Sequence, residues 1–292
     1  PNYEAYCETC ASVGMVFWNS RMHQLTGDSK YIDVMERSMY NGALAGISLN
    51  GDRFFYVNPL ASHGNHHRRE WYGTACCPSQ ISRFLPSIGS YIYGVSDKAI
   101  WVNLFIGNNA EITTGRETVI IHQKTGYPWD GAVELSIDSL KRPMEKEIRL
   151  RIPGWCKKYK ITINGEKVEN IPVDKGFAVI DRKWKNSDRL TFTMDMPIEV
   201  VEADNRVREN IGKRAVQRGP LVYCMEEVDN ISFDNLFLTR NTKFTNGFEP
   251  ALLNGVVAIN AYINSDSIRF VPYYAWDNRE PGQMKVWINY KE

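Results

Sequence analysis

The sequence has almost no surplus of charge of either sign, with 35 Lys and Arg residues against 34 Asp and Glu residues. Electrostatic binding to nucleic acid or to an anionic membrane surface needs a basic surplus, so neither partner is expected. No apolar run approaches the ~20 residues of a transmembrane helix. The glycine-rich phosphate loop, the Gly-x-Ser-x-Gly elbow and the His-Glu-x-x-His pair are also absent, so nothing favours the chemistry of those motifs.

Cysteine is scarce, with six residues in a chain of 292. This density is too low for a disulfide-stabilised scaffold. Cys156 and Cys224 stand alone in strand-like segments, where burial in the core is expected. The other four form two close pairs early in the sequence, namely Cys7 with Cys10 and Cys76 with Cys77.

The chain begins with Pro1-Asn2-Tyr3-Glu4, which contains neither an initiator methionine nor the features of a signal peptide. We therefore expect it to begin inside a longer protein. The sequence predicts no compartment for that protein.

Adjacent cysteines make a poor disulfide, because a bridge between them strains the intervening peptide. Cys76 and Cys77 are better suited to binding a metal, or to acting as a reactive thiol beside a ligand. Pro78 fits the first turn of a helix, where its missing N–H is no loss. A thiolate at a helix start is stabilised by the helix dipole. The alternative is two small buried residues in a tight turn.

Glu8 and Cys10 form a second candidate pair. Residues i and i+2 share a face only in an extended segment, so we expect both to lie just ahead of the first helix. With Cys76 and Cys77 they would supply three thiolates and one carboxylate, an acceptable tetrahedral set for Zn²⁺. The alternative is a capping carboxylate with core thiols.

Four further residues have open roles. His66 and His67 lie in a polar loop before the cysteines, where they could donate to a sugar or carboxylate, but a solvated loop is the preferred interpretation. By position alone, Glu36 is a solvated residue beside Arg37, and Tyr56 is a packing residue at the end of a strand.

Helical periodicity predicts helices over residues 9–25, 29–45 and 78–93, with a kink at Pro86 in the third. Ala11, Met15, Trp18, Met22 and Leu25 define the apolar face of the first, which is expected to be buried on most sides. Asn50-Gly51 predicts a hairpin turn within residues 47–60.

After residue 97, short alternating segments separated by turns indicate antiparallel β-sandwiches. The predicted strands cover residues 99–105, 118–123, 132–139, 147–152, 160–164, 177–181, 190–194, 198–203, 216–223, 236–238, 255–260, 268–272 and 285–288. The chain therefore reads as an α+β protein with a helical part over residues 1–97, a first sandwich over 98–199 and a second over 200–280.

Ordered motifs along the whole chain resemble glycoside hydrolase family 127, the bacterial β-L-arabinofuranosidases. They are AYCETCASVG at 5–14, ERSMYNG at 36–42, YVNPL at 56–60, WYGTACCP at 71–78, RIPGW at 151–155, QRGPLVY at 217–223 and VPYYAW at 271–276.

The resemblance implies that residues 1–97 are the terminal part of an (α/α)6 barrel, followed by β-sandwiches, with residues 281–292 returning to the first sandwich. It implies Glu8, Cys10, Cys76 and Cys77 as zinc ligands and Cys76 as the nucleophile. Glu36 and Tyr56 match positions that contact the arabinofuranose. Thr74 stands where some relatives carry a histidine.

The implied activity is retaining hydrolysis of β-L-arabinofuranosides in arabinose-containing oligosaccharides or glycans. The general acid is expected upstream of Glu8, before Pro1, so the isolated chain is expected to be inactive and to need the preceding barrel segments of the same protein.

Two functions of other kinds stay open. One is a non-enzymatic carbohydrate-binding β-sandwich with a structural zinc site, in which Cys76 would be inert to an electrophilic arabinofuranose mimic. The other is a polysaccharide lyase, which would need a Tyr/His or Lys base in place of a zinc thiolate.

Overall fold

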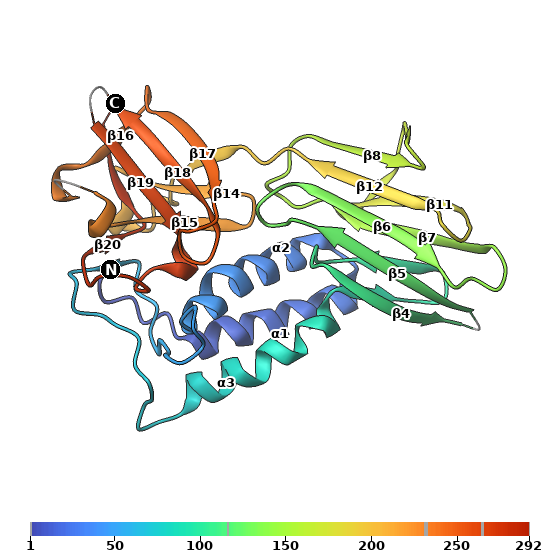
Figure 1. The fold of residues 1–292 in the computed structure, drawn as a ribbon, viewed down its shortest axis with the longest axis horizontal. Helices are drawn as coiled ribbons and strands as arrows, with labels where there is room; N and C mark the ends of the chain where they lie inside the picture. Colours follow the sequence, from blue (N-terminus) through green and yellow to red (C-terminus); the bar gives the residue numbers. More distant parts are fainter. Residues whose placement is uncertain (1, 116, 231–232, 264–265, 292) are drawn as a thin grey trace. The chain divides into compact units, whose positions relative to one another are not determined.

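The computed structural model describes residues 2–115, 117–230, 233–263 and 266–291. Pro1, where we predicted an internal start, lies outside them. The chain divides into two compact units, of which unit 1 comprises Pro1–Val16, Arg37–Leu85 and Pro197–Glu292, and unit 2 comprises Phe17–Glu36 and Pro86–Met196. The protein has an α+β fold that is mostly β-sheet, as predicted (Figure 1).

The three predicted helices are present, with altered ends. They are α1 (Thr9–Thr26), α2 (Ser29–Ser38) and α3 (Cys76–Phe84). The helical chain after α2 widens into a π-turn over Met39–Ala43 and tightens into a 3₁₀ turn over Leu44–Gly46. After α3, a 3₁₀ segment over Leu85–Tyr91 replaces the predicted kinked helix, because Pro86 cannot donate the next helical bond.

The apolar face predicted for α1 is not buried. Met15, Trp18 and Leu25 are 45%, 65% and 80% exposed, whereas Val13 and Val16 on another face are buried.

Among the described residues, no helix is long and apolar enough to cross a membrane.

Unit 1 contains one large sheet, in the order β16-β21-β14-β15-β19-β18-β17, to which β1, β13 and β20 also pair. Its core includes Phe55, Cys224, Tyr273 and Trp276. The strands are β1 (Ala61–Ser62), β13 (Ile198–Val201), β14 (Lys213–Arg218), β15 (Leu221–Glu226), β16 (Phe237–Thr239), β17 (Lys243–Glu249), β18 (Val256–Ile263), β19 (Asp266–Pro272), β20 (Met284–Lys285) and β21 (Ile288–Lys291).

The last strands do not return to the first sandwich, so that expectation is wrong. β20 pairs with β1 and β15, and β21 pairs with β14 and, in parallel, with β16. All of these partners belong to unit 1. The boundaries predicted at residues 97 and 199 stay predictions.

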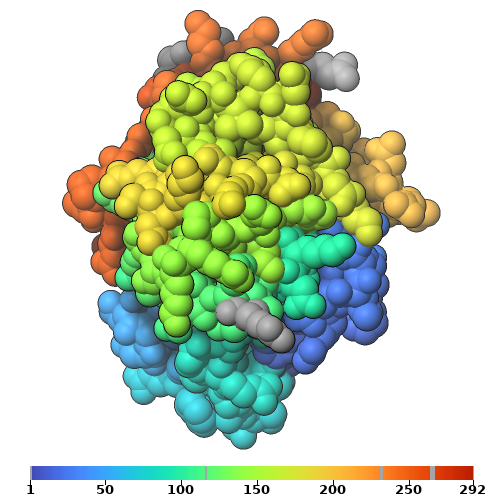
Figure 2. All heavy atoms as spheres, turned by 90° about the vertical axis from the view of Figure 1, so that its right-hand side faces the viewer, coloured from blue at the N-terminus to red at the C-terminus, as the bar shows by residue number. Residues whose placement is uncertain are grey.

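Unit 2 carries two sheets, in the orders β10-β11-β7-β3-β2 and β4-β5-β6-β12-β8-β9. Alternate residues of β5, β6 and β12 are buried. The chain that contains these strands supplies the green to yellow atoms in Figure 2. The strands are β2 (Tyr93–Val95), β3 (Ala99–Val102), β4 (Asn108–Thr114), β5 (Glu117–Thr125), β6 (Ala132–Asp138), β7 (Met144–Arg151), β8 (Tyr159–Ile163), β9 (Glu166–Lys167), β10 (Val173–Asp174), β11 (Phe177–Trp184) and β12 (Arg189–Met194). Among the described strands of this unit, β3 and β7 depart from the expected antiparallel pattern, because they pair in parallel.

Candidate active site

Glu8 and Cys10 are positioned by a short pairing that precedes α1. Glu8 forms an isolated antiparallel bridge with Val57, and the Thr9 N–H donates to the Tyr56 carbonyl at 3.0 Å. The first helical bond runs from the Ser12 N–H to the Glu8 carbonyl. Cys10 is therefore the second residue of α1, and the expectation that it precedes the helix is wrong. Glu8 does precede it.

Cys76 and Cys77 occupy the first two positions of α3, after Ala75. Pro78 lies in the first turn, as expected, where its missing N–H breaks no helical bond. Ser79 donates through both its backbone N–H and its hydroxyl to the Ala75 carbonyl. These bonds fix the start of α3 and with it the direction of both thiols.

The four predicted ligands converge. The carboxylate oxygen of Glu8 and the sulfur atoms of Cys10, Cys76 and Cys77 all lie within 4.8 Å of one another. Cys10 Sγ lies 2.7 Å from Cys76 Sγ, and Cys77 Sγ lies 3.8 Å from Glu8 Oε1. All of these cysteines are free thiols, and Cys76 is exposed whereas Cys77 is buried. Of the two adjacent thiols, only that of Cys76 is therefore open to a substrate.

The electrostatics of the cluster favour a cation. Burial raises the pKa of the Cys10 thiol, and its contacts with Cys76 and Cys77 raise it further. Burial also raises the pKa of Cys77. Several thiolates beside a carboxylate repel one another unless a positive charge lies among them, and a bound metal ion deprotonates a coordinating thiol. Three sulfur donors and one oxygen donor suit a thiophilic ion and not Mg²⁺ or Ca²⁺, so these residues fit a metal.

Tyr56 lies at the same cluster. A side-chain hydrogen bond with Glu8 raises the pKa of Tyr56 above its usual value. Its carbonyl also accepts from Cys77 Sγ at 3.6 Å. The structure thus brings Tyr56 together with two of the candidate ligands, beyond the packing role that its position alone indicated.

Glu36 lies in unit 2 and is 2% exposed, so the solvated position expected from its neighbours is wrong. Its Oε1 accepts from Arg151 Nη2 at 2.5 Å and from the Tyr127 hydroxyl at 2.9 Å. Burial opposes a charge on Arg151, but the Glu36 carboxylate and other partners hold its pKa above the usual value. The sugar contact predicted for Glu36 stays a prediction.

The loop over residues 62–70 is held by more contacts than the solvated loop that we expected from the sequence. Arg68 is 3% exposed, donates to the Ala45 and Tyr274 carbonyls, and lies over the Phe55 ring at 4.1 Å. His66 Nε2 lies 2.9 Å from the Val57 carbonyl, and burial lowers the pKa of His66. His67 pairs with Asp277 at 2.7 Å.

Tyr72 is a supporting residue that sequence reasoning missed. Its hydroxyl donates to the Phe54 carbonyl at 3.0 Å and accepts from the Tyr56 N–H at 3.2 Å. These two bonds hold the segment around Tyr56, in which Val57 pairs with Glu8 and the Tyr56 carbonyl accepts from Cys77 Sγ. The place of Tyr72 within the WYGTACCP motif at 71–78 was the signal in the sequence.

The thiol and carboxylate cluster lies in the helical part of the chain, which the β-sheet regions follow. Comparison with known families assigns this chain to a class of enzyme. The catalytic-domain profile of the family 127 β-L-arabinofuranosidases matches residues 1–90, the middle-domain profile residues 99–196 and the C-terminal-domain profile residues 198–289. The chain belongs to glycoside hydrolase family 127.

Individual relatives agree with this assignment. A non-reducing end β-L-arabinofuranosidase of Bifidobacterium longum is 34% identical over 98% of this chain and 49% of its own length. A family 127 β-L-arabinofuranosidase structure from Geobacillus stearothermophilus T6 is 43% identical with a TM-score of 0.93, matching all of this chain and 51% of its own. A second family 127 β-arabinofuranosidase structure is 38% identical with a TM-score of 0.94, and the match covers all of this chain and 50% of that structure's chain. The chain thus spans about half the length of these relatives.

Proposed function

We propose that this chain is part of a retaining glycoside hydrolase that cleaves β-L-arabinofuranosides, with Cys76 as the nucleophile and Glu8, Cys10, Cys76 and Cys77 as zinc ligands. The observation that carries the proposal is the convergence of four ligand atoms within 4.8 Å from two segments 66 residues apart. The activity named for the family and for the relatives agrees with it.

Zinc is the metal that best fits this donor set. Cysteine sulfur and carboxylate oxygen are both established zinc ligands, and four protein ligands give the tetrahedral arrangement of a zinc site. When bound, the ion would keep Cys76 deprotonated at neutral pH and thereby supply a nucleophile.

The chain's own residues then account for the first half of the reaction. The exposed Cys76 sulfur attacks the anomeric carbon, and a carbon–sulfur bond forms as the bond to the leaving oxygen breaks. Cys77, which is buried, and Cys10, which is partly buried, complete the ligand set with Glu8. Tyr56, through its hydrogen bond with Glu8, lines the place where the sugar would sit.

The leaving oxygen needs a proton from a carboxylic acid, which then activates the water that releases the sugar with retention. Glu8 is committed to the sulfur cluster, so the acid is expected outside these four residues. Attack by water at the same carbon breaks the carbon–sulfur bond and restores the Cys76 thiolate.

Residues 1–97 are proposed to contribute to an (α/α)6 barrel. The exposure of large apolar side chains on α1 supports this, since Trp18 and Leu25 are 65% and 80% exposed. Burying one such side chain contributes roughly 1.5–3 kcal/mol. The other barrel helices of a full-length protein would provide that cover, and arabinose-containing glycans would be its substrates.

Substitution of single cysteines in the full-length protein tests the assignment. Cys76→Ser should abolish turnover of a β-L-arabinofuranoside, because a serine alkoxide is far harder to form than a metal-bound thiolate. Cys156→Ser is the matched control, because Cys156 is a free thiol that lies outside the cluster. Turnover by Cys76→Ser comparable with the control would reject the nucleophile, and a carbohydrate-binding role with a structural metal would then be favoured.

A further inference from the structure

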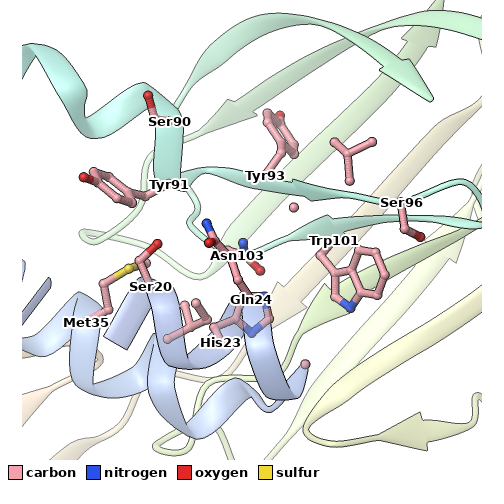
Figure 3. A pocket seen from close by; sticks show the side chains of 14 residues that line it. Ser20, His23, Gln24, Met35, Ser90, Tyr91, Tyr93, Ser96, Trp101 and Asn103 are labelled. Carbon is pink, nitrogen blue, oxygen red and sulfur yellow. The ribbon is translucent and has the colours of Figure 1, made fainter. Parts of the chain in front are cut away.

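Unit 2 contains a pocket that the proposed reaction does not use. Its volume is about 290 Å³, and it is lined by side chains from the second half of α1, from α2, and from the chain around β2 and β3 (Figure 3). Small-molecule sites begin at about 300 Å³, so this space suits one small ring and not an extended chain. All of the lining residues belong to unit 2.

The pocket is uncharged. None of its fourteen lining residues, all within the described part of the chain, is Asp, Glu, Lys or Arg. Burial lowers the pKa of His23 below its usual value, so this imidazole is neutral at neutral pH. A charged ligand would lose its hydration here without gaining a counter-charge, so the lining selects a neutral molecule.

Two unsatisfied polar groups lie in the wall. Asn103 is 4% exposed, and its Oδ1 has no hydrogen-bond partner among the described residues; the same holds for Trp101 Nε1. Trp101 and Asn103 are two residues apart at the end of β3, where alternate side chains share a face. A buried polar group without a partner is destabilising. A ligand that accepts or donates a hydrogen bond, once a small rotation of the Asn103 side chain turns its Oδ1 to the pocket, would therefore be favoured.

Aromatic and amide groups face the same space. Figure 3 shows Asn103 between Tyr91 and Trp101 in this view, with Gln24 contributed by α1. The Arg149 guanidinium lies 5.3 Å from the centroid of the Trp101 ring and holds it in place. Flat rings, carboxamides and serine hydroxyls such as that of Ser90 together match a molecule with apolar C–H faces and many hydroxyls.

From this arrangement we infer that the pocket is a second, non-catalytic carbohydrate site that binds one neutral sugar ring, with Asn103 and Gln24 as its hydrogen-bonding residues. It is separate from the Glu8, Cys10, Cys76 and Cys77 cluster, all of whose residues lie in unit 1. It therefore does not depend on the proposed reaction.

Calorimetric titration of the full-length protein with methyl β-D-galactopyranoside and methyl α-D-glucopyranoside tests the inference. Both probes are methyl glycosides fixed as six-membered rings, so they do not bind at a site that is specific for a furanose. At least one should bind saturably, and D-glucuronate and D-glucosamine should bind more weakly because the lining carries no counter-charge.

Two variants locate the binding. Asn103→Leu removes a carboxamide whose Oδ1 has no partner among the described residues, and Gln24→Ala changes an exposed side chain. Each should weaken binding about fivefold to tenfold. Arg21→Ala is the matched control, since Arg21 is exposed on the same helix and does not line the pocket. Turnover of arabinofuranoside without added pyranoside should be unchanged in all three.

The absence of saturable binding by either pyranoside would overturn the inference, including the case in which another part of the full-length protein covers the pocket. Binding that survives both Asn103→Leu and Gln24→Ala would also overturn it, because the sugar would then sit elsewhere. Equal or tighter binding of the charged sugars would contradict the neutral character derived for the lining.

Discussion

Glu36 forms an ion pair with Arg151, and substitution of Glu36 distinguishes a structural role from the sugar contact that the family resemblance predicts. Both side chains are buried, at 2% and 0% exposure. Removing one partner of a buried pair costs about 3–5 kcal/mol, because the other charge is left without compensation. Glu36→Gln keeps an acceptor for Arg151 and for the Tyr127 hydroxyl, so its cost should be smaller.

Arg151 retains one further carboxylate in Glu36→Gln. Its Nη1 lies 2.7 Å from Asp33 Oδ1, but the Asp33 side chain is 30% exposed and therefore better screened. We expect Glu36→Gln to lower the free energy of unfolding by about 1–3 kcal/mol. Glu36→Gln with Arg151→Met should recover part of this loss, because both charges of the pair are then removed.

The assay is urea unfolding of the full-length protein at pH 7, with steady-state kinetics on a β-L-arabinofuranoside for the same variants. Asp204→Asn is a matched control, because Asp204 pairs with Arg206 at an exposed position, where an ion pair contributes little. An unchanged free energy of unfolding together with a raised KM in Glu36→Gln would refute the structural reasoning and favour direct contact with the sugar.

Three further predictions concern the cluster, its support and the pH dependence of stability. Cys10→Ser should lose bound metal and, as a consequence, activity. Metal content is measured by atomic absorption and activity by turnover on the same sample, and metal retained at the wild-type level would contradict this. Tyr72→Phe, which removes two hydrogen bonds of about 1 kcal/mol each, should lower kcat with metal content intact, and an unchanged kcat would remove its positioning role. Burial depresses the pKa of His23 in the folded state, so the unfolded chain binds the extra proton as pH falls below about 6.5. The free energy of unfolding should therefore decline between pH 7 and 5, and His23→Gln should make this decline smaller. An equal decline in the variant and the wild type would contradict the role of His23.

Local patterns were sufficient to predict most elements of this fold. The helix over Thr9–Thr26 and the strands β6, β7, β8, β11 and β12 follow from apolar periods near 3.6 and 2 residues. The strands β4 (Asn108–Thr114) and β17 (Lys243–Glu249) escaped prediction because their sequences are mainly polar, and most residues of β17 are exposed. Pairing with a neighbouring strand stabilises them, and that is a tertiary effect.

Periodicity alone could not show which face of α1 is covered. The face with the larger side chains, including Trp18, is exposed, and the face with Val13 and Val16 is buried. Burial depends on which elements pack nearby, and the sequence of one helix carries no information about that. The same holds for the last strands, whose partners β14 and β15 lie much earlier in the chain, over residues 213–226.

The candidate site was predictable in its residues and not in its supports. Cys76-Cys77 and Glu8-x-Cys10 stood out by residue type, and the structure brings all four together. The roles of Tyr72 and Arg68 depend on backbone carbonyls at Phe54, Ala45 and Tyr274. Such contacts leave no pattern in a sequence, because any residue can supply a carbonyl.

The most direct test of the zinc-thiolate mechanism is parallel measurement of bound zinc and of β-L-arabinofuranoside turnover in one preparation of the full-length protein, before and after chelation and after zinc is restored. The account predicts that turnover falls with the zinc content, and that it returns when zinc is added to the wild-type protein but not to Cys76→Ser. Full turnover in protein that contains no bound zinc would contradict it.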